Sequence, residues 1–137
     1  MKVIGLNNKI YNLSLPKIVL KDDQTKRSKP HLRAKEILGG LFRGELIYEE
    51  VGLPGSGRLK VDFYVPRHSL MVEVQGRQHS EYVGHFHKNK LAFLKQLKRD
   101  QNKRKWCELN QIVLVELYDG DWEEQLRGAI SGVRRED

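Results

Sequence analysis

The stretch KVDFYVPRHSLMVEVQGRQH, residues Lys60 to His79, decides the fold of this chain. Apolar and polar residues alternate in KVDFYV and again in LMVEV, and this period of two predicts β-strands. The residues PRHS between the two runs predict a turn. The stretch therefore predicts a β-hairpin that carries Asp62 on its first strand and Glu73 and Gln75 on its second.

The polar residues of this hairpin are expected to gather on one face. Glu73 and Gln75 are two positions apart, so their side chains leave the strand on the same side, roughly 7 Å apart. If the strands pair antiparallel, Asp62 projects beside them. Two carboxylates on a covered sheet repel each other, and a cation must offset them. A divalent ion such as Mg²⁺, with Gln75 adding a carbonyl oxygen, would do so; alternatively, each acid pairs with a lysine on a half-solvated face.

The sequence around the hairpin predicts a small α/β domain. Ser28, with Pro30 close behind, has the residue types that begin a helix, and the apolar spacing continues to Phe42. One long basic helix, or two short ones, follows the hairpin and carries leucines that are predicted to face the core, namely Leu91, Leu94, Leu97 and Leu109. The predicted elements are helix 28–42, strands 45–51, 59–65 and 70–76, helix 87–110, strand 111–117 and helix 121–133. This order predicts an α/β sandwich, with the apolar run 111–117 as a strand buried on both sides.

Length and composition bound the class of protein. A chain of 137 residues suits one domain, here expected at 26–137 behind an N-terminal hairpin or arm at 1–25. No run approaches the ~20 apolar residues of a membrane span, and the N-terminus lacks the pattern of a secretory signal. The single cysteine, Cys107, excludes an intrachain disulfide and a thiolate-rich zinc site. We therefore expect a cytoplasmic protein without a membrane partner.

Positive charge is concentrated in one segment. The net charge is +7, and between Arg77 and Lys105 nine Lys and Arg outnumber two acidic residues, which accounts for the whole excess. A basic stripe of this kind is typical of proteins that bind a phosphate backbone, although a solvated lysine face is the alternative. The candidate nucleic-acid-binding residues are Arg77, Lys88, Lys90, Lys98, Arg99, Lys103 and Arg104.

These motifs together resemble the PD-(D/E)XK nuclease superfamily. The similar pieces are LPG before the first hairpin strand, VDFYVP, EVQG followed by a histidine, and RDQNKRKWCELNQIVLVEL. Within the superfamily they resemble the branch that contains the very-short-patch repair endonuclease and the homing endonucleases with an EDxHD motif. The resemblance implies a restriction-endonuclease-like fold, a three-layer α/β sandwich with a small mixed central sheet flanked by helices.

The resemblance also implies roles for individual residues. Asp62 and Glu73 would bind the catalytic metal, His79 would be the histidine of the motif, and Asp100 its last aspartate. Gln75 stands where the superfamily usually has lysine, so His79 or a helix lysine such as Lys98 would have to replace that lysine. Asp100 has a second interpretation as the partner of Arg104 in a helical ion pair.

The first acid of the motif has several candidates. The opening helix contains one carboxylate, Glu36, which helical geometry places nearly opposite the apolar stripe. Glu45, Glu49 and Glu50 are the alternatives in the region that follows the helix.

The function implied by the resemblance is hydrolysis of phosphodiester bonds in DNA with Mg²⁺ or Mn²⁺. The enzyme would be an endonuclease of the homing, nicking or repair type, from a phage or mobile element, in the cytoplasm of a bacterial or phage-infected cell. One alternative is a junction- or flap-specific nuclease that forms a homodimer through the N-terminal arm. Another is a catalytically inactive nucleic-acid-binding module of the same fold, which the glutamine at position 75 favours.

Overall fold

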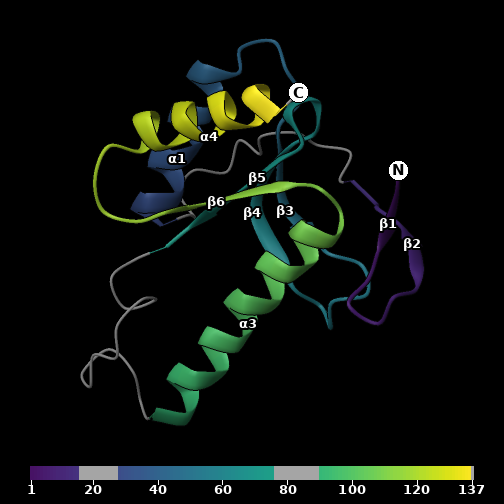
Figure 1. The fold of residues 1–137 in the computed structure, drawn as a ribbon. Coiled ribbons are helices and arrows are strands. Elements are labelled where there is room, and N and C mark those ends of the chain that lie inside the picture. The colour runs from purple at the N-terminus through teal and green to yellow at the C-terminus, as the bar shows by residue number, and fades with distance from the viewer. Residues whose placement is uncertain (16–27, 76–89, 137) are drawn as a thin grey trace.

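The computed structural model describes residues 1–15, 28–75 and 90–136, and in these ranges the chain has an α/β fold (Figure 1). The elements are β1 (Lys2–Ile4), β2 (Ile10–Asn12), α1 (Lys29–Leu41), β3 (Tyr48–Gly52), β4 (Lys60–Val65), a 3₁₀ turn (Pro66–His68), β5 (Leu70–Val74), α3 (Lys90–Leu109), β6 (Val113–Leu117) and α4 (Trp122–Glu136). Figure 1 shows α1 and α4 on one face of the main sheet and α3 on the other. The predicted order of helices and strands is confirmed.

The main sheet is mixed and has four strands in the order β3-β4-β5-β6. The first three strands pair antiparallel, and β6 runs parallel to β5, with α3 in the crossover between them. The prediction that β6 is a strand buried on both sides is confirmed in part, since its residues pack into the core under α4 on one face and into the core under α3 on the other. Val115 and Leu117 are buried and the other three residues are half-buried, and among the described strands β6 lies at the edge of the sheet.

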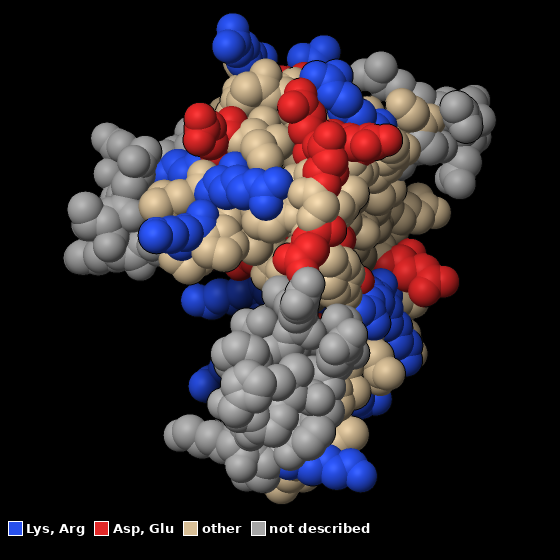
Figure 2. Space-filling model, turned by 90° about the vertical axis from the view of Figure 1, so that its left-hand side faces the viewer, with Lys and Arg blue, Asp and Glu red and all other residues tan. Residues whose placement is uncertain are grey.

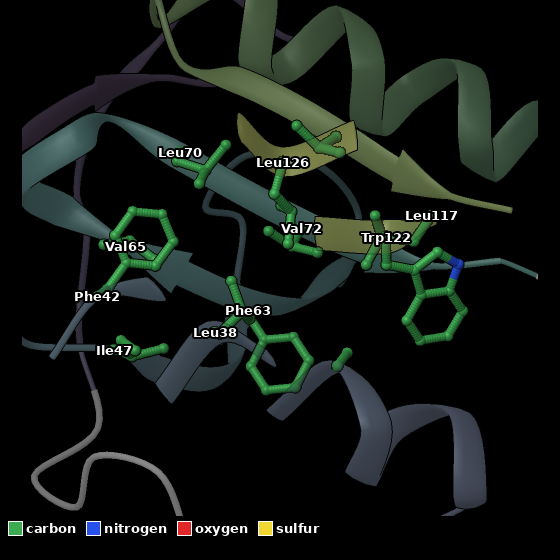
Figure 3. Packing of buried hydrophobic residues seen from close by; sticks show 12 residues of the cluster. Leu38, Phe42, Ile47, Phe63, Val65, Leu70, Val72, Leu117, Trp122 and Leu126 are labelled. Carbon is green, nitrogen blue, oxygen red and sulfur yellow. The ribbon is translucent and has the colours of Figure 1, made fainter. Parts of the chain in front are cut away.

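One hydrophobic core fills the space between the sheet and helices α1 and α4 (Figure 3). Ala34 and Leu38 of α1 pack there against Phe63 of β4 and Val72 of β5. The helix begins as its sequence predicts, because the Ser28 side chain accepts a hydrogen bond from the backbone N–H three residues later. This core fixes the hairpin β4–β5 from one side and leaves its other side to α3.

A second core lies on the α3 side of the sheet. Trp106 and Cys107 of α3 pack there against Tyr64, Met71 and the N-terminal hairpin residue Val3. The prediction that Leu91, Leu94 and Leu109 face the core was wrong, since they are 60%, 48% and 37% exposed. Only the C-terminal half of α3 therefore packs on the sheet.

The N-terminal strands form the antiparallel hairpin that the sequence predicts. The side chain of Asn110, just after α3, receives a hydrogen bond from the Ile4 backbone N–H and donates one to the Ile4 carbonyl oxygen. The hairpin is thus attached to the body of the same chain. Among the described helices, none is long and apolar enough to cross a membrane.

Candidate active site

Asp62 and Glu73 lie side by side at the point where β4 and β5 separate. The antiparallel register pairs Phe63 with Val72, so the next pair along would be Asp62 with Glu73. At this point side-chain carboxylates replace backbone carbonyl groups as hydrogen-bond acceptors. Glu73 Oε1 accepts the Asp62 N–H at 2.9 Å, and Asp62 Oδ2 accepts the Val74 N–H at 2.8 Å. Each acid thus holds the backbone of the opposite strand, and the pair is fixed in position.

A lysine from α3 neutralises one member of the pair. The Nζ atom of Lys103 lies 3.0 Å from Oε2 of Glu73. Glu73 is only 6% exposed, and burial together with the nearby charge of Asp62 raises its pKa to about 7 even though Lys103 acts in the opposite direction. The cation expected beside the two carboxylates is therefore supplied, at Glu73, by the chain itself.

Asp62 opens onto a groove at the surface. The groove has a volume of about 510 Å³. Among the described residues, no hydrogen bond reaches Oδ1 of Asp62, and Asp62 is part of the lining of this groove. The charged residues that line the groove are Glu50, Arg58, Lys60, Asp62, Arg99 and Lys103.

Glu50 is the carboxylate that β3 brings to this groove. The register pairs Glu49 with Phe63 and Val51 with Val61, which places Glu50 across from Asp62. Its backbone has φ of 52°, a left-handed conformation that is uncommon for a residue with a side chain. The strand pattern of the sequence could have placed Glu50 across from Asp62 through the register of the two strands. It could not have revealed the left-handed backbone of Glu50.

The other candidate glutamates are held elsewhere. Glu49 is buried on the α1 side of the sheet, 2.9 Å from Nε2 of His31 and 3.5 Å from Nζ of Lys35. Glu45 lies 2.8 Å from Nε2 of His68 in the 3₁₀ turn. Glu36 is exposed on α1, in the helical layer on the opposite face of the sheet from α3 (Figure 1). Of the four candidates, Glu50 is the one that shares a groove with Asp62.

Gln75 belongs to a second polar cluster next to the acidic pair. Its Nε2 donates to Oε2 of Glu116 at 3.1 Å, and Glu116 also accepts two hydrogen bonds from the Arg104 guanidinium and one from the Tyr118 hydroxyl. Burial opposes ionisation of Glu116, but the hydrogen bond and charge of Arg104 outweigh it and hold the pKa of Glu116 below its usual value. Gln75 Oε1 is buried and has no hydrogen-bond partner in the described part of the chain.

The remaining predicted residues lie along α3 or outside the described ranges. Asp100 is buried one turn before Lys103, and Arg104 pairs with Glu116 on β6. Lys90 and Lys98 are exposed. His79, Arg77 and Lys88 lie in the segment 76–89, which the structure does not describe.

Lys and Arg side chains are visible beside the N-terminal half of α3 in one view of the molecule. In Figure 2, the charged side chains visible around the lower end of the molecule, at the height of the N-terminal half of α3 in Figure 1, are Lys and Arg. The carboxylates visible on this face lie higher up. The helix that carries the basic stripe of the sequence thus reaches the acidic pair through Lys103, which contacts Glu73, and through Arg99, which lines the groove beside Asp62.

The donor atoms of the pair suit a hard divalent ion. Mg²⁺ is commonly held by one or two carboxylates, with water and phosphate completing its shell. Asp62 offers Oδ1, which accepts no hydrogen bond from the described residues, and Glu73 offers oxygens that now bind Lys103 and the Asp62 N–H. No group of three or more His, Cys, Asp and Glu side chains is arranged for metal binding in residues 1–15, 28–75 and 90–136. The residues present therefore fit a two-carboxylate site and not a closed protein cage.

Similar proteins occur in viruses. The chain is 44% identical over 66 residues to uncharacterized protein 307L of Invertebrate iridescent virus 6, covering 48% of this chain and 34% of that protein. It is 44% identical over 66 residues to uncharacterized protein 094L of Frog virus 3 (isolate Goorha), covering 47% and 43%. A match to uncharacterized protein 033L of Invertebrate iridescent virus 3 has 41% identity over 59 residues, covering 43% and 30%. The chain thus spans less than half of these relatives, and no family model or solved structure matches it.

Proposed function

We propose that this chain is a Mg²⁺- or Mn²⁺-dependent DNA endonuclease with a restriction-endonuclease-like fold. The observation that carries the proposal is the linked pair of Asp62 and Glu73, which lies at the diverging ends of β4 and β5 under a strongly basic helix. A pair of fixed carboxylates beside a cationic groove has the chemistry needed to bring a metal ion and a phosphodiester together. The viral origin of the similar proteins suggests that it acts in an infected host cell.

In this proposal both residues of the pair are metal ligands. Asp62 and Glu73 would hold the metal ion, which when bound polarises a phosphoryl oxygen and lowers the pKa of the attacking water. Asp62 lines the groove, whereas the buried Glu73 must lose its proton, which its pKa of about 7 permits near neutral pH. Glu50, across from Asp62, is the candidate for the first acid of the motif.

Lys103 is the candidate replacement for the missing lysine of the motif. Gln75 at the usual lysine position is turned toward Glu116, whereas the Lys103 ammonium is 3.0 Å from Glu73 and also lines the groove. An ammonium group there would neutralise the developing charge on the phosphate. Arg99 of the same helix would bind the neighbouring backbone, and His79 keeps its proposed role in transferring or orienting the proton of water.

The test is nicking of a supercoiled plasmid by purified protein in Mg²⁺ or Mn²⁺. Asp62→Asn and Glu73→Gln should abolish nicking, and EDTA should do the same. Glu124→Gln, which changes an exposed carboxylate on α4, serves as the matched control and should retain activity. A plasmid that stays intact with the unaltered protein in both metals would overturn the proposal.

A catalytically inactive nucleic-acid-binding module is the second candidate. One observation in its favour is Gln75, which stands at the lysine position of the motif and donates to Glu116. Another is Glu73, because both of its carboxylate oxygens already bind groups of the chain itself. Such a module would bind DNA equally well with and without Mg²⁺ and would never nick it. A junction- or flap-specific nuclease, acting as a homodimer, would instead cleave branched substrates and elute as a dimer in gel filtration.

A further inference from the structure

We propose that the loop from Pro54 to Lys60, held by the N-terminal hairpin, is a second DNA-binding wall of the groove. In this proposal Arg58 and Lys60 bind phosphates of the strand that passes Asp62, while α3 binds it from a second element. The proposal rests on the proposed function for its ligand, DNA. It adds two binding residues outside the basic segment 77–105. It also assigns a function to the N-terminal hairpin, which holds the loop in position.

The charges of the groove support a polyanionic ligand. Two cations come from the loop and β4, Arg58 and Lys60, and two come from α3, Arg99 and Lys103. Arg58 and Lys60 are exposed, so their head groups are accessible from the groove. A strand of DNA lying between the two elements would meet cations from both, with Asp62 between them in the lining of the same groove.

The loop holds Arg58 in an uncommon conformation. Arg58 has φ of 72°, and it follows two glycines with similar values, Gly55 at 74° and Gly57 at 76°. A left-handed conformation is strained for a residue with a side chain, and such residues cluster where a ligand is clamped. Glu50, with φ of 52°, lines the same groove. Two strained residues therefore meet at one surface feature.

Hydrogen bonds make the loop rigid in spite of its glycines. The Leu53 N–H donates to the Leu59 carbonyl oxygen at 2.8 Å and closes the loop at its base. Inside it, the Ser56 hydroxyl donates to the Leu53 carbonyl oxygen and accepts the Leu59 N–H at 3.1 Å. The indole N–H of Trp106 on α3 donates to the Pro54 carbonyl oxygen at 2.8 Å. Arg58 is thus presented from a fixed frame, which lowers the entropic cost of binding.

The N-terminal hairpin holds the tip of this loop. The Leu6 N–H donates to the Gly55 carbonyl oxygen at 2.8 Å. A Cβ atom added to Gly5 would lie 2.8 Å from Gly55 Cα and 2.7 Å from the Tyr11 ring, so neither glycine has space for a side chain. The close contact requires glycine on both sides and couples the position of the hairpin to that of the loop.

The experiment measures binding of a short fluorescein-labelled DNA duplex by anisotropy in EDTA, across a salt series. Arg58→Gln and Lys60→Gln should each weaken binding up to about tenfold near 0.1 M salt and lower the slope of log K against log salt by about 1. Arg67→Gln, an exposed arginine in the 3₁₀ turn, is the matched control and should change neither. Unchanged affinity and slope in both loop variants would overturn the proposal.

A second pair of variants tests the hairpin. Gly5→Ala should separate hairpin and loop and weaken binding as much as Arg58→Gln, whereas Gly52→Ala, where a Cβ meets nothing within 4 Å, should bind normally. Normal binding by folded Gly5→Ala protein would remove the hairpin from the proposal. Because these measurements contain no metal, a failure to nick plasmid would overturn the endonuclease function alone and leave the binding result valid.

Discussion

The ammonium group of Lys103 lies 3.0 Å from the carboxylate of Glu73, and this contact joins helix and sheet across 30 positions of sequence. Glu73 is buried, with a pKa raised to about 7 mainly by that burial. The charge state of the contact therefore changes near neutral pH. Stability, metal binding and DNA binding should all depend on the same proton.

Replacing Lys103 by Met should destabilise the protein only at higher pH. Because the folded-state pKa of Glu73 is raised, its stabilising effect is full below about pH 4.5 and is lost as pH rises through 7. Without Lys103 this pKa rises further, so at pH 8 the variant should lose about 3 kcal/mol, as expected for a buried ion pair missing one partner. Urea denaturation at pH 5 and pH 8 measures the difference. The exposed Lys105→Met serves as control, and an equal loss at both pH values would contradict the ionic explanation.

Binding of Mg²⁺ or Mn²⁺ should release a proton from Glu73. Below pH 7 the apparent affinity should fall about tenfold per pH unit, because the carboxyl must first ionise. Thermal denaturation with a titration of Mn²⁺ at pH 6 and pH 8 detects this through a metal-dependent rise of Tm that is larger at pH 8. Asp62→Asn should show no rise at either pH. A rise of equal size at pH 6 and pH 8 would exclude Glu73 as a ligand.

Glu50 and Glu36 should differ in their effect on nicking. Glu50 lines the groove beside Asp62, whereas Glu36 lies on α1 in the layer on the other face of the sheet. Glu50→Gln should lower the nicking rate by roughly 10- to 100-fold, the range for a group that supports a metal site. Glu36→Gln should nick at the normal rate. The reverse result would assign the first acid of the motif to the opening helix.

Cys107 should be inert toward thiol reagents in the folded protein. It is buried against Met71, and burial raises its pKa to about 12. Iodoacetamide at pH 8 should therefore leave it unmodified, as measured by mass spectrometry, and should modify it fully in urea. This measurement also reports whether each variant above is folded. Rapid alkylation of the native protein would mean that α3 leaves the sheet readily.

The sequence was sufficient to predict the hairpin but not the reach of α3. Apolar and polar residues alternate around Asp62 and Glu73, and this pattern permits only one register of the two strands. A shift of the register by one residue would expose Phe63 and Val72. A helix of 20 residues is about 30 Å long and a strand of five about 17 Å, so half of α3 extends beyond the sheet. The leucine spacing could not reveal this, because it depends on which turn of the helix meets the strand.

The candidate site was only partly predictable for a similar reason. The antiparallel register alone brings Asp62 and Glu73 together. The partner of Glu73 depends on how α3 crosses the sheet, and the sequence pointed only to His79 or to some lysine of the basic helix, such as Lys98, as a substitute for the lysine expected at position 75. The role of Arg58 could not be predicted, because it lies in a glycine-rich turn whose φ values cannot be inferred from residue type.

The two hydrogen bonds between Asn110 and Ile4 connect positions 106 residues apart. During synthesis this contact of the first strands can form only after the whole of α3 has left the ribosome, because Asn110 follows the helix. Loop closure over such a distance is slow and is expected late in folding. A polypeptide released before position 110 would lack this anchor together with β6 and α4, so both its sheet and its main core would be incomplete.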